Sequence, residues 1–409
     1  MSYQLLNAIS SDLVKEVGAF KYVRSNLFAD LESPPQIAII LKGSRGIGKS
    51  TLLLQFLHKK QQDGHKVLYL SADSSVISSS LTELAFELNK SGVSYLAVDE
   101  IHKYADWQRE VKTILDSFPK LKLIVSGSSS LHLNYKVADL SRRHIMLCAK
   151  GLSFREYLEK NYSLNLKKYS LIEILENTDS IVNEVINELQ DNKINLIEIF
   201  HIYLREGYFI TRDNFNRIGL YYDSLINSIN STIEVDLPSV YTELDGQSIY
   251  NIKSMLKHIA RKCPFTPNIQ EISIALGIAK DNTLKKYLQY LHDGEIILNL
   301  YLIDKFHKNF LKPQKIFLNN PNYAYAFFDT PDIGTIRETF VANCLVNHGN
   351  VTAPAQGDFC VNDKWTFEVG GKSKTKKQLK GIKDSFVLAD NTLLANRTTI
   401  PLWLLGFLW

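Results

Sequence analysis

A glycine-rich stretch near the N-terminus constrains the fold of this 409-residue chain more than any other feature. Residues 43–50 read Gly-Ser-Arg-Gly-Ile-Gly-Lys-Ser and fit G-x-x-x-x-G-K-[ST], the pattern of a loop that cradles phosphate groups. An apolar run typical of a buried strand, residues 36–41, precedes the loop, and residues 52–57 after it have a helical pattern. Because strand, glycine loop and helix are the context that this motif requires, a chance glycine-rich turn is the weaker alternative.

The loop residues predict a nucleotide site. Glycine lets the loop backbone adopt conformations that residues with a Cβ resist, so its N–H groups converge on phosphate oxygens at a helix N-terminus. Lys49 is expected to reach the β- and γ-phosphates, and the Ser50 hydroxyl to ligate Mg²⁺. The expected nucleotide-binding residues are Gly43, Ser44, Arg45, Gly46, Ile47, Gly48, Lys49, Ser50 and Thr51.

Apolar strands alternate with helical stretches from residue 36 to about residue 150, which indicates a parallel α/β sheet. Further strands are expected at residues 66–70, 94–98, 121–125 and 144–148. The strand at 94–98 runs into Asp99 and Glu100, and adjacent acids beside a buried strand are costly unless a cation or hydrogen bonds compensate them. We therefore expect Asp99 to hold Mg²⁺, directly or through water, and Glu100 to polarise the attacking water.

A serine and a pair of arginines near the later strands are further candidates for catalysis. Ser128 lies just past the strand at 121–125, at the edge where parallel strands end, and is expected to sense the γ-phosphate. Arg142 and Arg143 precede the strand at 144–148. One of them is a candidate arginine finger, acting within the chain or on a neighbouring subunit, a role worth on the order of a thousandfold in rate. An ordinary pair of surface arginines is the alternative.

Composition places the chain among ordinary globular proteins, with 45% apolar residues, 22% charged residues and a net charge of +4. This mild positive charge does not by itself argue for nucleic acid. The four cysteines lack the spacing of a zinc site or a disulfide framework. No signal peptide and no membrane-length apolar run is evident, so a cytoplasmic protein is expected. The apolar end of the chain, residues 400–409, is expected to form a buried final strand.

The rest of the chain changes character twice. Residues 151–245 are helical in pattern and are expected to form a helical segment or lid after a domain at 1–150. Residues 246–310 show three helical patterns and then a strand, which predicts a winged helix. Its lysines at 280, 285 and 286 are placed to touch phosphates, although winged helices also serve as packing modules. Residues 311–409 mix helix and strand.

Several of these segments together resemble a known family. The residues that carry the resemblance are the loop with its internal arginine, the stretch from Tyr95 to His102 with the later Trp107, residues 126–130, residues 139–143 and the junction at 152–158. They are similar to predicted prokaryotic AAA-superfamily ATPases, close to the signal-transduction (STAND-like) P-loop class. In that family the arginine usually follows a glycine. This points to Arg143, but Arg142 stands here in the glycine position.

The resemblance also implies a C-terminal domain of unknown function that is similar to restriction endonucleases, with a core of the type Asp…Glu-x-Lys. A hairpin with its loop at residues 362–364 would pair Phe359 with Phe367 and place Asp358 opposite Glu368. Opposed carboxylates repel unless a cation joins them, so these two residues, with Glu338, are a candidate second metal site. The chain departs from the pattern at Gly370, where the lysine is expected. A nuclease-like fold kept only for binding is therefore the alternative.

The sequence thus predicts a P-loop NTPase sheet, a helical segment, a winged helix and a nuclease-like α/β domain. The expected activity is Mg²⁺-dependent ATP hydrolysis by a molecular switch, and the choice of ATP over GTP rests on the resemblance alone. Three modes of action stay open: a switch that acts on nucleic acid, an ATP-regulated scaffold for a protein partner, and an ATP-regulated nuclease. A basic segment, residues 372–383, favours nucleic acid, and a solvated helix face is its alternative.

Overall fold

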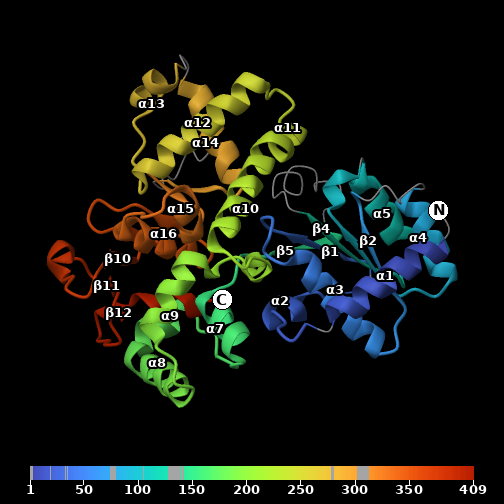
Figure 1. Cartoon of the computed structure of the whole chain (residues 1–409), viewed down its shortest axis with the longest axis horizontal. Helices are drawn as coiled ribbons and strands as arrows, with labels where there is room; N and C mark the ends of the chain where they lie inside the picture. The colour runs from blue at the N-terminus through green and yellow to red at the C-terminus, as the bar shows by residue number, and fades with distance from the viewer. Residues whose placement is uncertain are drawn as a thin grey trace. The chain divides into compact units, whose positions relative to one another are not determined.

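The computed structural model describes residues 3–18, 20–32, 34, 36–73, 80–104, 106–127, 140, 142–277, 281–301 and 313–409. The chain divides into two units, Met1–Gly151 and Leu152–Trp409 (Figure 1). Among the described residues, no helix is long and apolar enough to cross a membrane.

A five-stranded parallel sheet in the order β2-β3-β4-β1-β5 forms the centre of the N-terminal unit. The strands are β1 (Ala38–Lys42), β2 (Val67–Ser71), β3 (Tyr95–Asp99), β4 (Lys122–Gly127) and β5 (His144–Cys148). Each lies within two residues of its expected position, and the parallel α/β class is confirmed. Because the strands are parallel, their carboxyl ends share one edge of the sheet, where the glycine loop also lies.

Helices cover both faces of this sheet (Figure 1). One face packs on α4 (Leu81–Lys90) and α5 (Trp107–Ser117), which begins with the buried Trp107 and buries Val111 and Ile114 at helical spacing. The helices α1 (Tyr3–Gly18) and α3 (Lys49–Gln62) contact β2. The unit also holds α2 (Ser25–Asp30) and a short 3-10 helix, η1 (Ile101–Lys103).

The C-terminal unit begins with a run of helices. These are α7 (Phe154–Tyr162), α8 (Leu171–Asp191), α9 (Leu196–Ile202), η3 (Tyr203–Gly207), η4 (Ile210–Asn214), α10 (Ile218–Ser231), η5 (Thr232–Asp236) and α11 (Leu237–Val240). The fully buried Phe154 packs its ring against Phe200, Tyr203 and Phe407, with ring centroids 5.1, 5.4 and 6.3 Å away. The start and the end of this unit therefore share one core.

Three helices and a hairpin follow. They are α12 (Gly246–Lys262), α13 (Ile269–Leu276), α14 (Asp281–Asp293) and the antiparallel strands β6 (Ile297–Leu300) and β7 (Lys315–Leu318). Between α12 and α13, Phe265 forms an antiparallel bridge to Ile316 of β7. A short third strand position therefore lies beside the hairpin.

A second five-stranded sheet, in the order β12-β11-β10-β9-β8, lies in the last part of the chain. Its strands are β8 (Val351–Thr352), β9 (Phe359–Val361), β10 (Trp365–Gly370), β11 (Ser385–Ala389) and β12 (Thr399–Pro401), and its helices are α15 (Pro321–Phe327), α16 (Ile333–Leu345), η6 (Lys376–Leu379) and η7 (Leu402–Phe407). The expected final strand is wrong beyond Pro401, where residues 402–407 turn into a buried 3-10 helix.

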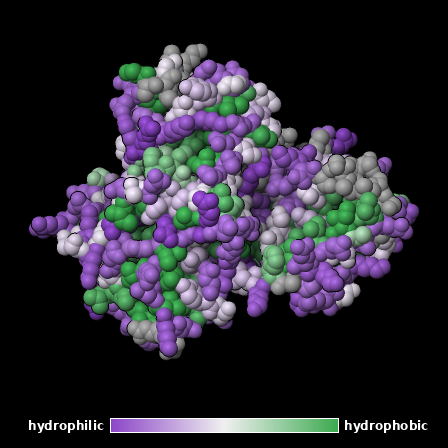
Figure 2. Space-filling model, viewed as in Figure 1, coloured by the Kyte–Doolittle hydropathy of each residue, from purple (hydrophilic) through white to green (hydrophobic). Residues whose placement is uncertain are grey.

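Exposed apolar side chains are scattered over the surface. Phe86, Ile172, Tyr250, Ile274 and Leu394 are all exposed, and they belong to different parts of the chain. Figure 2 shows apolar areas separated by hydrophilic ones on the face drawn. Such scatter is normal for a folded protein, and over the described residues it marks no single docking face.

Candidate functional site

The glycine loop joins β1 to α3 and has the backbone that its sequence requires. Gly46 and Gly48 have φ values of 79° and 91°, in the left-handed region that favours glycine. A Cβ on Gly43 would lie 2.2 Å from the Ala149 carbonyl oxygen and 2.4 Å from Ile47 Cδ1. Only glycine fits at this position, because the loop packs closely against Ala149 and Ile47. The loop leads into the N-terminus of α3, where a phosphate binds favourably.

Lys49 lies under the loop. Its side chain is buried, and its Nζ donates to the carbonyl oxygens of Gly43 and Ser44 over 2.8 Å each. The loop therefore folds around this ammonium group, which is positioned to contact phosphate oxygens bound by the loop amides.

Asp99 is the centre of a hydrogen-bond cluster at the end of β3. The carboxylate is only 2% exposed. Its Oδ2 accepts from Ser50 Oγ and from the Tyr69 hydroxyl, which is 2.8 Å away. Its Oδ1 accepts from Ser126 Oγ and from the Glu100 backbone N–H at 3.0 Å. These donors compensate the burial of the charge, as the sequence argument required.

The contact between Ser50 and Asp99 joins the two predicted magnesium ligands, which are 49 residues apart in the chain. A hydroxyl and a carboxylate are oxygen donors of the kind that Mg²⁺ prefers, so these residues fit the ion. Both Asp99 oxygens already accept two hydrogen bonds each. Contact through a metal-bound water would preserve more of them than direct ligation.

Sequence reasoning missed two members of this cluster, Tyr69 and Ser126. Ser126 is fully buried on β4, the strand between β1 and β3, and its neighbour Val125 pairs with Val98. Tyr69 lies on β2, and burial, followed by the charge of Asp99, raises its pKa, so the phenol stays a donor. Only the strand order brings the two side chains together, although Ser126 lies just before the predicted Ser128 in the sequence, one residue before the end of β4.

Glu100 follows Asp99 with a left-handed φ of 50°. Its side chain is 25% exposed, and its Oε2 lies 3.3 Å from Nδ1 of His102. The His102 side chain is only 2% exposed. The proposed base is therefore accessible to solvent and lies against a buried imidazole.

The strand register shows where Arg143, the candidate arginine finger, lies relative to the glycine loop. In the parallel pair of β1 and β5, Ala38 lies opposite His144 and Lys42 opposite Cys148. Arg143 thus precedes β5 at the edge opposite the glycine loop, about 16 Å away at roughly 3.3 Å per residue. Its guanidinium pairs with Asp116. The register and this pair give no support to a role for Arg143 at the γ-phosphate of its own chain, and both that role and the neighbouring-subunit role stay predictions.

Arg142 is the other member of that pair and has a left-handed φ of 69°. Ser128, the predicted γ-phosphate sensor, lies outside the described residues. So does Lys280 of the predicted winged helix.

The predicted second metal site needs correction. The hairpin register is confirmed, since Phe359 pairs with Phe367 and Val361 with Trp365. The cations of the site, however, are lysines. Lys315 Nζ lies 2.5 Å from Glu338 and 3.7 Å from Asp358, and Lys374 Nζ lies 2.5 Å from Glu368.

In the part of the chain that the structure describes, no group of three or more acidic, histidine or cysteine side chains is arranged to hold a metal. Burial raises the pKa of Glu338, and the nearby charge of Asp358 adds to the rise, while Lys315 opposes both. Asp358 Oδ2 also accepts from the Val369 N–H at 2.8 Å. Asp358, Glu368 and Glu338 are thus satisfied by protein groups.

Gly370 explains the position of Lys374. A Cβ on Gly370 would lie 2.6–2.7 Å from the Cβ, Cγ and Cδ atoms of Lys374. The stem of Lys374 therefore fills the space that a side chain at position 370 would occupy. Glu368 is therefore paired with a lysine that lies four residues beyond the position expected from the pattern.

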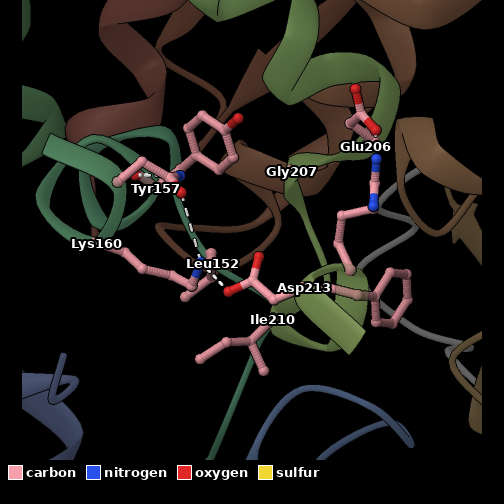
Figure 3. A pocket seen from close by; sticks show the side chains of 10 residues that line it. Leu152, Tyr157, Lys160, Glu206, Gly207, Ile210 and Asp213 are labelled. Atoms are coloured by element: carbon pink, nitrogen blue, oxygen red, sulfur yellow. Dashed lines mark hydrogen bonds and ion pairs between the residues drawn. The ribbon is translucent and has the colours of Figure 1, made fainter. Parts of the chain in front are cut away.

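A cavity of about 250 Å³ lies in the C-terminal unit, away from both clusters in the sequence (Figure 3). Figure 3 shows Lys160 turned toward Asp213, with which it forms an ion pair. Arg212 Nε likewise donates to Glu206 over 2.6 Å. Because its charged groups are paired with one another, the cavity gives no evidence for a charged ligand.

Comparisons with known proteins support the N-terminal assignment. Residues 35–158 match the family model of the AAA domain. The chain is also 26% identical over 322 residues to uncharacterized protein MJ1637 of Methanocaldococcus jannaschii. That match covers 74% of this chain and 65% of the relative, so the chain spans just under two thirds of the relative's length.

Similar solved structures include AMPPCP-bound DnaA from Aquifex aeolicus, at 18% identity and a TM-score of 0.24, covering 70% of this chain and 88% of that one. A structure of katanin self-assembly is 20% identical with a TM-score of 0.24, and covers 39% of this chain and 58% of that one. Scores this low do not establish a shared overall arrangement. The family match and the site geometry together support an AAA-superfamily ATPase domain in the N-terminal unit.

Proposed function

We propose that the N-terminal unit binds Mg·ATP and hydrolyses it as the step that drives a conformational switch. The observation that carries this proposal is the contact between Ser50 of the glycine loop and the buried Asp99. In the proposed complex the loop amides and Lys49 hold the phosphates, while Ser50 and Asp99 hold the magnesium ion.

Hydrolysis in this site needs one proton acceptor. The oxygen of a water molecule forms a bond to the γ-phosphorus as the bond to the β-phosphate bridging oxygen breaks, and Glu100 takes the proton of the water. ADP and phosphate are the products. Phosphoryl transfer depends mainly on positioning and on neutralising charge, which are the tasks of Lys49 and the ion.

Two substitutions test this proposal. Lys49→Ala should abolish tight ATP binding, measured by calorimetry, while Lys59→Ala on the exposed face of α3 should bind as wild type does. Glu100→Gln should keep ATP binding and lose turnover, measured as phosphate release. Equal turnover in Glu100→Gln and wild type would show that Glu100 is not the base.

We further propose that residues 246–318 form a winged helix that contacts nucleic acid. The topology supports it, because helix, bridged position Phe265, two helices and hairpin follow one another in the order that such a domain uses. Lys286 on α14 is exposed, as are Lys372, Lys377, Lys380 and Lys383 near the second sheet. Their charges suit a phosphate backbone.

DNA binding at low salt, measured by fluorescence anisotropy, tests this second proposal. Replacing Lys372, Lys377, Lys380 and Lys383 with glutamine should weaken binding and reduce the salt slope by about 0.9 for each phosphate that the protein no longer neutralises. Lys59 and Lys90, which are exposed in the N-terminal unit, provide the control substitutions. Absence of DNA binding at low salt, with ATP-dependent association of the protein with itself, would favour the protein-scaffold alternative.

The nuclease alternative has less support. Lys315 and Lys374 occupy the positions beside Glu338, Asp358 and Glu368 where a cation would be needed. We therefore propose that the second sheet is a binding module. Metal-dependent DNA cleavage by wild type that is lost in Asp358→Ala would contradict this.

A further inference from the structure

The buried His102 lies beside the proposed base of the ATPase site. We propose that His102 is a positioning residue, which fixes the Glu100 carboxylate in the orientation from which it takes the proton of the attacking water. The inference rests on the proposed hydrolytic function. It adds a residue to which neither the nucleotide loop nor the acid pair assigns a role.

The backbone turns so that the two side chains meet. Glu100 has a left-handed φ of 50°, and its carbonyl oxygen accepts from the Lys103 N–H at 2.9 Å, which closes the 3-10 turn η1. His102 lies within this turn, and its Nδ1 is 3.3 Å from Glu100 Oε2. A left-handed conformation at glutamate is unfavourable, so the surrounding contacts must hold the turn in place.

Glu100 is anchored at both ends. Its backbone N–H donates to Asp99 Oδ1 at 3.0 Å, which ties the main chain to the magnesium cluster. Its carboxylate contacts His102, and this contact limits rotation of the carboxylate about its Cγ–Cδ bond. Oε2 faces the imidazole, so the same contact also sets the direction of Oε1.

The two side chains differ in burial, and this difference indicates which of them positions the other. The His102 side chain is 2% exposed, whereas that of Glu100 is 25% exposed. The imidazole is therefore a fixed part of the interior, and the glutamate is the partner that adopts its orientation. A proton acceptor acts only from within hydrogen-bond reach of the proton, and a small misplacement lowers the rate by up to about a hundredfold.

A hydrogen bond to the ionised Glu100 requires Nδ1 to be the donor, because a carboxylate only accepts. In the structure the 3.3 Å approach is a close contact without hydrogen-bond geometry, and we expect it to tighten when the substrate binds. Asparagine places its side-chain N–H₂ near the position of Nδ1, whereas alanine provides no donor. His102→Ala therefore removes both the ring and the donor, whereas His102→Asn removes the ring and keeps a donor.

Steady-state ATP hydrolysis on the full chain tests the role. His102→Ala should lower kcat by about tenfold or more and leave KM and the ATP dissociation constant within twofold of wild type. His102→Asn should recover most of kcat. The exposed His65 offers a matched control, and His65→Ala should hydrolyse ATP as wild type does. A wild-type kcat in His102→Ala, or no recovery in His102→Asn, overturns the proposal.

A second measurement does not depend on turnover. The nitrogen-15 NMR signal of His102 Nδ1, assigned by its disappearance in His102→Asn, should shift on Glu100→Gln in the nucleotide-free protein, and an unchanged signal overturns the proposal. If wild type hydrolyses ATP no faster than Lys49→Ala, the proposed function fails. The NMR signal still decides whether His102 holds Glu100.

Discussion

At the scale of single residues, the proposed magnesium site is built around the buried carboxylate of Asp99, which accepts four hydrogen bonds. Ser50 and Asp99 were predictable because the loop motif and the acid-ended strand each have a local pattern. Tyr69 and Ser126 were not, because each looks like an ordinary strand residue in its own segment. Their role comes from the strand order, which places β2 and β4 on either side of β3.

Tyr69 should strengthen magnesium binding by orienting Asp99. Tyr69→Phe removes the donor at 2.8 Å from Asp99 Oδ2 and keeps the ring. A hydrogen bond to a charged group is worth about 1.5–3 kcal/mol, so the Mg²⁺ concentration for half-maximal ATP hydrolysis should rise by about tenfold or more. Tyr104→Phe, whose hydroxyl contacts Glu110, serves as the control. An unchanged Mg²⁺ requirement would show that Tyr69 plays no part in the site.

Glu32 should make the stability of the protein depend on pH in the acid range. Burial acts to raise its pKa, but hydrogen bonds from Lys122, Lys60 and Tyr95 outweigh burial and lower the pKa from 4.5 to about 2. A lowered pKa contributes stability above pH 4.5, and this contribution is lost as the pH falls from 4.5 toward 2.

Thermal unfolding of Glu32→Gln measures this effect. The variant should unfold at a lower temperature than wild type at pH 7, and the difference should shrink as the pH is lowered from 5 to 2. A difference that stays constant over this range would contradict the assignment.

At the scale of elements, local patterns predicted the pairing of strands better than the partners of charged side chains. The alternation of Phe359, Val361, Trp365 and Phe367 was sufficient for the hairpin register, because a slip by one residue would expose every apolar side chain. Lys315 lies on a strand 43 residues before Asp358, and no local pattern connects the two. A metal was therefore expected where lysines lie.

Gly370 should be required for the ion pair in β10. Gly370→Ala places a Cβ where the stem of Lys374 lies and should displace the ammonium from Glu368, whose side chain is only 4% exposed. Leaving a buried charge without its partner costs about 1–3 kcal/mol, measured as the free energy of unfolding in urea.

The neighbouring glycine provides the control. At Gly371 the nearest atom to an added Cβ is 3.5 Å away, an ordinary contact, so Gly371→Ala should be nearly neutral. Combining Gly370→Ala with Lys374→Met should cost little more than either change alone, since both remove the same pair. Wild-type stability of Gly370→Ala would contradict this explanation of the missing lysine.

At the scale of the whole molecule, the AAA domain match covers residues 35–158, which is less than half of the chain. The sequence change near residue 150 coincides with the division between the two units. The finer division at residues 245 and 310 stays a prediction, because residues 152–409 form one unit with a shared core. Composition cannot predict such sharing, since Phe154 and Phe407 are 253 positions apart.

In the proposed site a triphosphate binds between Lys49 and the Asp99 cluster. The most direct test is a crystal structure of the full chain carrying Glu100→Gln, grown with ATP and Mg²⁺. We expect the γ-phosphate beside Lys49 Nζ, and magnesium beside Ser50 Oγ with Asp99 as a direct ligand or one water away. Nucleotide bound elsewhere, with Lys49 still held by the carbonyl oxygens of Gly43 and Ser44, would contradict it.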